Sequence, residues 1–278
     1  MKTIHELLTR SSEPEIIEDE IYNRVIDAVK TNMIGTQLLA LRLGPNDIPG
    51  DQISIPLQTK NSMLVHEVAE GTEIPIDVEG YTEFNLKPVK FGIRPMITRE
   101  MMEDSKFAVM QRNIDEAGYQ MGRKLDSLIL AQIKTGADAN TVAHAVTGAT
   151  AITVQNITDA MEFLELDDHT PTDLILSAGA ANDIRNIDTF VEADKAGITN
   201  PSQSLIGTIY GMKVWVSNAV TANYAFIIDR RHALCLAEKR PITIKRYSEE
   251  WKDMVGFAIT ARWKERYLRA EACAYISI

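Results

Sequence analysis

The chain has 278 residues, of which 45% are apolar and 24% charged, and its formal net charge is −10 with a pI near 5.1. These values are typical of a globular protein with a sizeable core, and they argue against a surface that grips nucleic acid phosphates. The two cysteines, Cys235 and Cys273, are too few for a disulfide framework, so we expect small core side chains rather than reactive thiols.

The first twenty residues lack the apolar run of a signal peptide, and no stretch of the chain approaches the roughly 20 apolar residues that cross a bilayer. We therefore expect neither secretory export nor a membrane span. The S-x-x-E spacing of Ser12–Glu15 is that of a capping box and predicts a helix over about 13–30. Its apolar face fits packing on its own domain or on a neighbouring subunit.

An extended hairpin is predicted after the breaker GPNDIPGD (44–51), which contains two prolines and two glycines. Apolar residues alternate with polar ones over 53–57, and residues 81–97 are rich in aromatic and β-branched types. A polar, acidic connection with turn signals at Gly71 and Pro75 joins these strands at a distal tip. Because a two-stranded hairpin has too little core to be stable alone, another part of the structure must support it.

The segment TREMMEDS (98–105) is dense in charged groups, and Thr98 is expected to cap a short helix that ends near Ser105. From Phe107 to Ile133 the apolar residues recur at helical spacing, which predicts one helix of about 40 Å. Gly136 is expected to stop it. The charged residues that lie off the apolar stripe are Arg112, Asp115, Glu116, Arg123, Lys124 and Asp126.

The second half of the chain alternates predicted helices and strands, which indicates an α+β or α/β layer. A helix is predicted over 153–168 with Asn156 or Thr158 near its cap, and the residues after Ser177 predict a strand-to-helix turn. The strand-rich tail has an apolar end, which indicates that it is tied into a sheet. Strands are predicted over 173–177, 213–217 and 225–229.

No motif for chemistry stands out. A dinucleotide fingerprint, a P-loop and a nucleophile elbow are missing from the sequence. The five histidines do not have the spacing of zinc ligands. We interpret the local cluster Asp167-Asp168-His169 as a solvated loop and the trio Arg230-Arg231-His232 as a turn.

The charged side chains of TREMMEDS are the remaining candidates, since Glu100 with Asp104, or Glu103 with Arg99, has the composition of an acid/base pair. Catalytic carboxylates need burial or opposed environments to shift their pKa values, and the outer face of a helix stays solvated. We therefore expect no enzyme activity. The sequence predicts no catalytic, cofactor-binding or metal-binding residues, and no cofactor.

Residues 68–136 contain a series of short motifs in a fixed order: Glu70-Gly71 with Pro75, Lys87-Pro88-Val89-Lys90, Thr98-x-Glu100 with Asp104-Ser105, and Gly136. On these motifs the segment resembles the major capsid proteins of tailed phages and related archaeal viruses, which have the Hong Kong 97-type fold. The order of the downstream segments TPTDLILS, SLIGTIYGMKVWVSNAV and AFIIDRRHALCLAEKRPITIK also fits, so the resemblance covers roughly residues 50–278.

The resemblance implies an α+β fold in which several parts meet neighbouring subunits. Its segments are an N-terminal arm (1–50), an extended hairpin loop (51–90), a peripheral domain with a long spine helix (91–145), an axial domain (146–236) and a return to the peripheral domain with C-terminal strands (237–278). The resemblance explains the long helix and the unsupported hairpin, because both find packing partners in an assembled shell.

The implied function is a structural subunit that self-assembles through pentamers and hexamers into an icosahedral virion shell around double-stranded DNA, formed in the host cytoplasm. Further partners would be scaffolding, portal or decoration proteins. The alternative is an encapsulin-type nanocompartment shell around a cargo enzyme, which shares this fold. A third interpretation, an enzyme of unknown type, predicts a small discrete oligomer.

Two departures limit what is carried over. Members that cross-link themselves join a hairpin lysine to an asparagine of the peripheral domain, and although Lys60 has the right place, residues 237–278 contain no asparagine. We therefore expect no isopeptide bond. The long N-terminal scaffolding segment of some members is also missing, so either a separate scaffold acts or the shell assembles without one.

Overall fold

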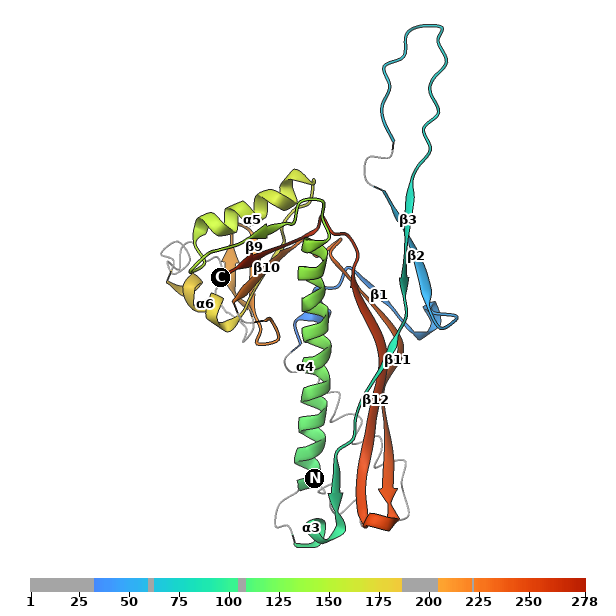
Figure 1. The fold of residues 1–278 in the computed structure, drawn as a ribbon, viewed down its shortest axis with the longest axis vertical. Coiled ribbons are helices and arrows are strands. Elements are labelled where there is room, and N and C mark those ends of the chain that lie inside the picture. The colour runs from blue at the N-terminus through green and yellow to red at the C-terminus, as the bar shows by residue number, and fades with distance from the viewer. Residues whose placement is uncertain (1–32, 60–62, 105–108, 187–204, 222) are drawn as a thin grey trace.

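The computed structural model describes residues 33–59, 63–104, 109–186, 205–221 and 223–278, and every structural statement below concerns these residues. Figure 1 shows one long central helix, a six-stranded sheet with two shorter helices, a second sheet of long strands, and a narrow hairpin that projects far beyond them. The helix predicted near the N-terminus lies outside the described residues.

The central helix α4 (Val109–Asp138) packs on both sheets. Its expected existence is confirmed, but it ends at Asp138 rather than at Ile133. The residues near its start join the core of the second sheet, and those near its end join the core of the six-stranded sheet: Ile114, Ala117 and Met121 in the first case, Ile129, Leu130, Ile133 and Ala137 in the second. No described helix combines the length and the apolar character that crossing a bilayer requires.

Gly136 does not stop the helix, and the prediction for this residue is wrong. A Cβ at this position would lie 3.0 Å from Cβ of Tyr267 and 3.3 Å from Sγ of Cys273. The glycine therefore lets α4 approach the chain between the last two strands. Asn140 instead supplies a hydrogen-bond donor to the last turn of the helix, because its Nδ2 donates to the carbonyl of Ala137 (3.3 Å). The same Nδ2 also donates to the carbonyl of Ala270 (3.1 Å).

The six-stranded sheet contains the predicted strands of the second half, which are confirmed as β7, β9 and β10. Two strands, β6 and β8, were not predicted. The pairs β6–β13 and β7–β9 are parallel, and the other pairs are antiparallel. In spatial order the strands are β6 (Ala145–Val146), β13 (Cys273–Ser277), β10 (Tyr224–Ile228), β7 (Asp173–Leu176), β9 (Met212–Val216) and β8 (Leu205–Ile209).

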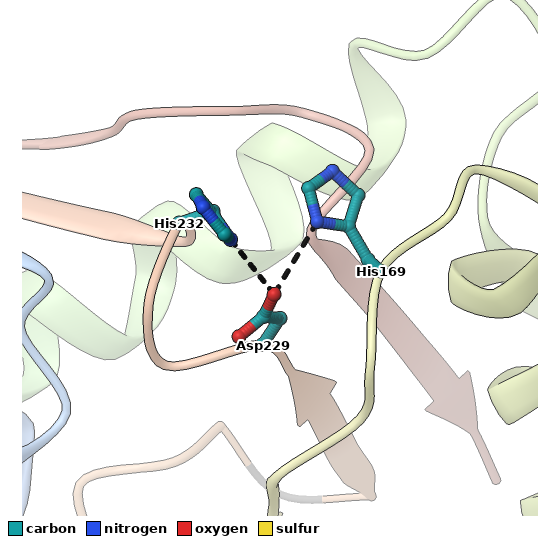
Figure 2. Close-up of side chains that lie close together, drawn as sticks. All are labelled: His169, Asp229 and His232. Carbon is teal, nitrogen blue, oxygen red and sulfur yellow. Dashed lines mark hydrogen bonds and ion pairs between the residues drawn. The ribbon is translucent and has the colours of Figure 1, made fainter.

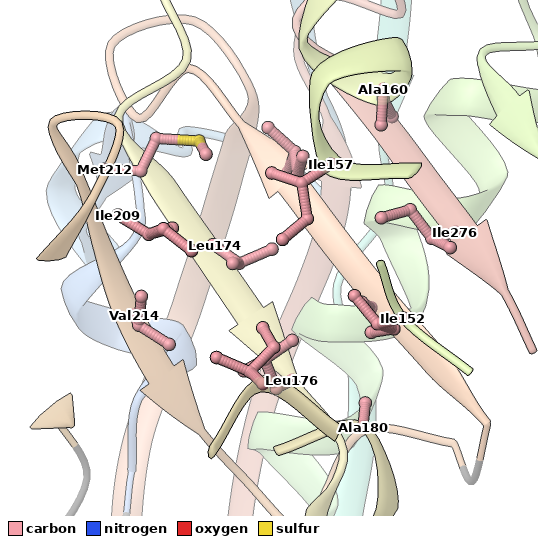
Figure 3. Packing of buried hydrophobic residues seen from close by; sticks show 14 of the residues in the cluster. Ile152, Ile157, Ala160, Leu174, Leu176, Ala180, Ile209, Met212, Val214 and Ile276 are labelled. Atoms are coloured by element: carbon pink, nitrogen blue, oxygen red, sulfur yellow. The ribbon is translucent and has the colours of Figure 1, made fainter. Parts of the chain in front are cut away.

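This sheet lies between helices on both faces. Helices α5 (Val154–Leu166) and α6 (Ala178–Arg185) share one core with Leu174 and Leu176, whereas Ile175 between them points to the core formed with α4. Figure 3 shows the first core, in which residues of α5 lie over the strands. All four residues of β7 are buried, as a strand covered on both faces requires.

The N-caps of these helices follow local hydrogen bonding. Helix α5 is capped by Thr153, and Asn156 lies near this cap as predicted. Thr153 Oγ1 accepts from N of Asn156 (3.3 Å) while Oδ1 of Asn156 accepts from N of Thr153 (3.2 Å), which places Asn156 at the third helical position of a capping box. Ser177 caps α6 through N of Ala180 (3.4 Å), which confirms the strand-to-helix turn.

The second sheet is built on two long antiparallel strands, β11 (Leu234–Glu249) and β12 (Met254–Tyr267), which are joined by the 3₁₀ turn η3 (Glu250–Lys252). The other strands are β1 (Leu41–Leu43), parallel to β11, and β4 (Val89–Ile93) and β5 (Met96–Thr98), both antiparallel to β12. Segment 237–278 thus divides, because β11 and β12 lie in this sheet and β13 lies inside the six-stranded one.

The remaining elements are the predicted hairpin and the short helix before α4, and both are confirmed. The hairpin strands β2 (Ile53–Gln58) and β3 (Tyr81–Leu86) follow η2 (Pro45–Asp47), the 3₁₀ turn in the predicted breaker. Along β2 half-buried residues alternate with exposed ones, as expected from the sequence pattern. Helix α3 (Arg99–Asp104) begins directly after β5.

Asp126 is buried on α4, which contradicts its predicted place among the solvated charged residues. Its Oδ1 accepts hydrogen bonds from N of Ile34 (3.1 Å) and of Gly35, and its Oδ2 accepts from Oγ of Ser217 (3.3 Å). This carboxylate therefore joins α4 to the turn η1 (Gly35–Gln37) before β1 and to the loop after β9. Burial raises the pKa of Asp126 above its ordinary value of 3.8.

Replacement of Asp126 by alanine should lower the free energy of unfolding by about 2–6 kcal/mol, because two buried N–H groups lose their acceptor at roughly 1–3 kcal/mol each. Asp126→Asn keeps an oxygen acceptor and should cost less. Urea denaturation of the isolated subunit measures both values. Equal losses for the two variants would contradict the assigned hydrogen bonds.

The difference in the free energy of unfolding between Asp126→Asn and the wild type should depend on pH. Because the folded-state pKa of Asp126 is raised, the stability that it contributes is present at pH below about 3.9 and is lost as the pH rises through the folded-state pKa. The free energy of unfolding of Asp126→Asn, relative to that of the wild type, should therefore increase between pH 4 and pH 7. A constant difference over this range would contradict a buried carboxyl group that ionises.

Gly256 marks a place where β12 passes the chain before β5 without room for a side chain. A Cβ there would lie 2.2 Å from the carbonyl oxygen of Pro95 and 2.9 Å from Cα of Met96. Gly256→Ala should lower the free energy of unfolding by at least about 1–3 kcal/mol. The matched control is Gly179→Ala in α6, where no atom lies within 4 Å of the added Cβ, and it should be neutral or raise the stability by up to about 1 kcal/mol. Thermal denaturation that affects both variants alike would refute this packing argument.

Candidate functional site

The hairpin of β2 and β3 reaches well beyond the rest of the molecule (Figure 1). Its strands pair along their whole length, and N of Thr59 donates to the carbonyl of Gly80 at 2.8 Å. Residues 63–80 then form an extended loop that turns at Gly71, whose φ of 82° favours glycine. Across this loop Nε2 of His66 and Oδ2 of Asp77 lie 2.9 Å apart and connect its two arms.

The base of the hairpin is anchored to the second sheet, which supplies the support that the sequence requires. Phe84 and Leu86 are buried in one cluster with Cys235 and Ala237 of β11. The guanidinium of Arg266 lies 5.0 Å from the centre of the Phe84 ring. The half-buried residues that complete the cluster from the hairpin are Ile53, Ile55 and Leu57.

Polar contacts fix the entry to the hairpin. Asp51 accepts a hydrogen bond from Nη2 of Arg262 at 2.9 Å and forms an ion pair with Nζ of Lys87 at 2.9 Å. The pKa of Asp51 is lowered first by the hydrogen bond with Lys87 and then by its charge and by Arg262. Arg262 Nε also donates to the carbonyl of Pro88 (3.2 Å), so β12 holds both ends of the hairpin.

The distal loop exposes an unusual amount of apolar surface. Ile74, Ile76 and Val78 alternate with other residues along one arm of the loop, and each is at least 71% exposed. Seven large apolar side chains of the hairpin are between 54% and 103% exposed: Met63, Leu64, Val65, Ile74, Ile76, Val78 and Tyr81. Exposed apolar surface of this kind marks an interaction site.

The same segment is strongly acidic. Residues 63–83 contain no lysine or arginine. Their six acidic residues are Glu67, Glu70, Glu73, Asp77, Glu79 and Glu83. A surface that receives this loop should therefore combine apolar contacts with positive charge at its rim.

The charged residues of TREMMEDS lie in a junction between strand and helix. Oγ1 of Thr98 accepts from N of Met101 at 3.2 Å, which confirms Thr98 as the cap of α3. Arg99 pairs with Asp253 at the start of β12 (Nε to Oδ1, 3.0 Å) rather than with Glu103. Glu100 and Asp104 are exposed on α3, which gives neither carboxylate the burial that acid/base catalysis needs.

The two cysteine thiols are buried, as expected, and offer no nucleophile. Burial raises the pKa of Cys235 to about 12 and also raises the pKa of Cys273. Since the thiolate is the reactive form, both residues act as core side chains at neutral pH.

One cluster combines potential metal ligands from distant parts of the sequence, and Figure 2 shows both imidazole rings directed at one carboxylate. Oδ2 of Asp229 lies 3.3 Å from Nδ1 of His169 and 2.8 Å from Nδ1 of His232. The three donor atoms lie within 4.8 Å of one another. The carboxylate of Asp229 is buried, and this desolvation alone would raise its pKa. The hydrogen bonds with His232, with N of Arg231 and with His169 outweigh this effect, so the pKa of Asp229 is lowered.

This arrangement corrects one prediction and confirms another. His169 is only 11% exposed, so its interpretation as part of a solvated loop is wrong. The trio 230–232 does form a turn, with Nη2 of Arg230 donating to Oδ1 of Asp173 at 2.8 Å. Sixty residues separate His169 from Asp229, so spacing could not reveal the cluster. The available signal was local: D-x-x-H at 229–232 and a histidine in the loop that follows a helix.

Comparison with known proteins gives a consistent family. A family model described as phage capsid protein matches residues 82–264, which is more than half of the chain. Comparison with curated protein sequences finds no match.

Solved structures with the same architecture come from phages. The chain is similar to a structure from Microbacterium phage Oxtober96 (17% identity, 89% of this chain and 91% of that chain covered, TM-score 0.65) and to the capsid structure of the cyanophage P-SCSP1u (13% identity, 88% and 88%, TM-score 0.68). It is also similar to the mature capsid of bacteriophage PhiM1 (13% identity, 88% and 87%, TM-score 0.66). At these identities the likeness establishes an α+β fold of the Hong Kong 97 type.

Proposed function

The chain belongs to the phage capsid protein family, and we propose that its copies assemble through pentamers and hexamers into an icosahedral shell that encloses double-stranded DNA. It is a structural major capsid protein and not an enzyme. Its place is the capsid of the virion, and we propose that the shell forms in the host cytoplasm.

We assign the parts of a capsid subunit to the elements as follows. Residues 1–50 form the N-terminal arm and 51–90 the extended hairpin loop. Helix α4 is the spine, and the sheet of β11 and β12 belongs to the peripheral domain, which takes up 91–145 and returns from residue 237. The six-stranded sheet is the axial domain over 146–236, completed by β13.

The observation that carries the proposal is the exposed apolar loop at the end of the hairpin. A large apolar side chain contributes about 1.5–3 kcal/mol when it is fully buried, so seven exposed ones on one projection favour a partner. We propose that the partner is a neighbouring copy. The exposed cations Lys90, Lys245 and Arg246 on β4 and β11 are suited to the acidic loop of another subunit. Such a contact is heterologous, and it repeats from subunit to subunit until the shell closes.

The relation to DNA follows from charge. A chain with a net charge of −10 is suited to enclosing DNA without binding it in a sequence-specific manner. Scaffolding, portal and decoration proteins are the further partners that we propose, and no membrane takes part. The match to the phage capsid family favours a capsid over an encapsulin-type compartment with a cargo enzyme.

The purified protein should form megadalton shells or capsomer rings, which light scattering and negative-stain microscopy detect. Native particles should contain double-stranded DNA that is protected from nuclease. DNA-free shells with a protein cargo would point to the compartment instead. A small discrete oligomer under all assembly conditions would refute the proposal.

The hairpin should be required for closure of the shell but not for the fold of the subunit. Replacing residues 63–78 by a short Gly/Ser turn keeps the paired strands and the buried base, so circular dichroism and thermal denaturation should stay near the wild type. Shells should be missing in microscopy, because the apolar contacts to the neighbouring copy are removed. Unchanged particles would contradict the role of the loop.

Point variants separate the apolar contact from the length of the loop. The triple variant Ile74→Asn, Ile76→Asn and Val78→Asn should reduce the yield of closed shells at least about tenfold, since 1.4 kcal/mol of lost contact per subunit already corresponds to a factor of ten. The control is Val142→Asn, since Val142 and Ile74 are both 71% exposed and Val142 lies after α4. Loss of shells in both variants would show a general effect of exposed apolar side chains.

A further inference from the structure

We propose that His169, Asp229 and His232 bind a divalent transition-metal ion, with Zn²⁺ as the ion that best fits two imidazoles and one carboxylate. This binding goes beyond the assembly function, because it needs only the folded subunit. The donor atoms already share one small volume, with Oδ2 of Asp229 facing both Nδ1 atoms.

The distances fit a tetrahedral site after a small adjustment. With metal–ligand bonds of about 2.0–2.1 Å, the ligand atoms of a tetrahedral zinc site lie about 3.3 Å apart. The distance from Asp229 to His169 has this value, and the distance of 2.8 Å to His232 has to lengthen by a few tenths of an ångström. The donor nitrogens of the two imidazoles lie within 4.8 Å of each other and have to move closer together. His232 is 46% exposed, so its side chain has room for this movement.

The ligands are oriented by hydrogen bonds of their surroundings, as in known metal sites. Oδ1 of Asp229 accepts from N of Arg231 at 3.0 Å, which leaves Oδ2 for the two imidazoles. The backbone of His169 is fixed because its N donates to the carbonyl of Leu164 (2.9 Å). Asp168 before it has a positive φ of 61°, which turns the chain towards the cluster.

The charge balance also allows a cation. One cationic side chain of the turn, Arg230, is directed to the buried Asp173, whose Oδ1 lies 2.8 Å from Nη2 of Arg230. Asp173 in turn accepts from Nε1 of Trp215 (2.7 Å), so it is not a further ligand. In a neutral imidazole the proton moves from Nδ1 to Nε2 when Nδ1 binds the metal, and the site requires no other proton acceptor.

The place of the cluster indicates a structural role. The turn 229–233 is the point where the chain leaves β10 of the six-stranded sheet and enters β11 of the other sheet. The return crossing lies beside it, since N of Leu268 donates to the carbonyl of Ala233 (2.7 Å) and N of Asp229 to that of Ala272 (3.1 Å). A bound ion would join the loop after α5 to the turn 229–233, and this turn is hydrogen-bonded to the return crossing, so the ion would help to hold the two sheets in one arrangement. Solvent would complete the coordination on the exposed side of His232.

The test is metal binding by the purified full-length chain after treatment with EDTA and dialysis. Isothermal titration with ZnCl₂ should show one ion per chain, and Co²⁺ should give the visible absorption of a tetrahedral site. Saturating Zn²⁺ should raise Tm by about 5 °C or more, because the ion binds the folded state only. Loss of an outer-shell partner already weakens metal binding 10- to 100-fold, so His169→Ala and His232→Ala should each weaken it at least about 100-fold.

Two controls keep the result interpretable. His66→Ala removes a histidine that contacts one aspartate at 2.9 Å but has no second imidazole, and it should leave zinc binding unchanged. Asp229→Asn keeps the size of the side chain and should fold in EDTA while losing the ion. Zinc binding that is absent in the wild type, or that persists in both His169→Ala and His232→Ala, would overturn the proposal and leave a cluster of hydrogen bonds.

Discussion

The structure depends on one constraint: a single helix has to bury apolar side chains against two different sheets. The residues near the start of α4 belong to the core over β11 and β12, and those near its end belong to the core under the six-stranded sheet. Among the described residues α4 is the long element that covers this face of both sheets, whereas α5 and α6 lie on the opposite side of the six-stranded one. The relative position of the two sheets is therefore set by the length and straightness of α4.

Local patterns predict most of the elements. Alternation identified β2, aromatic and β-branched runs identified β3 and β4, and the helical period of the apolar residues identified α4. The predictions that failed concern residues whose environment is set by contacts with residues far away in the sequence. Gly136 resembles a helix stop in the sequence, but the close approach of Tyr267 and Cys273 explains it. Asp126 resembles a solvated charge in the sequence because its hydrogen-bond donors, the N–H groups of Ile34 and Gly35, lie more than ninety residues earlier.

The candidate sites differ in the same way. The exposed hairpin could be predicted, since a two-stranded projection without a core of its own requires outside support. The cluster around Asp229 could not, because a helix end and a strand end become neighbours only when the six-stranded sheet places β7 beside β10. Polar groups thus mark the joints of the molecule: Asp126 between α4 and η1, and Asp229 between the sheets. A buried polar group that finds its partners fixes one arrangement more sharply than apolar packing does.

The position of β13 has a consequence for the order of events during synthesis. This strand lies between the short edge strand β6 and β10, so β10 lacks one of its two neighbours, and β6 lacks its partner, until residues 273–277 have left the ribosome. The second sheet has the same property, since β1 pairs with β11 almost two hundred residues later. Pairings of such long range form late, and a nascent chain has no finished surface to offer to a neighbour. The topology thereby makes both complete sheets available for contacts between copies only after β11 to β13 have been synthesised.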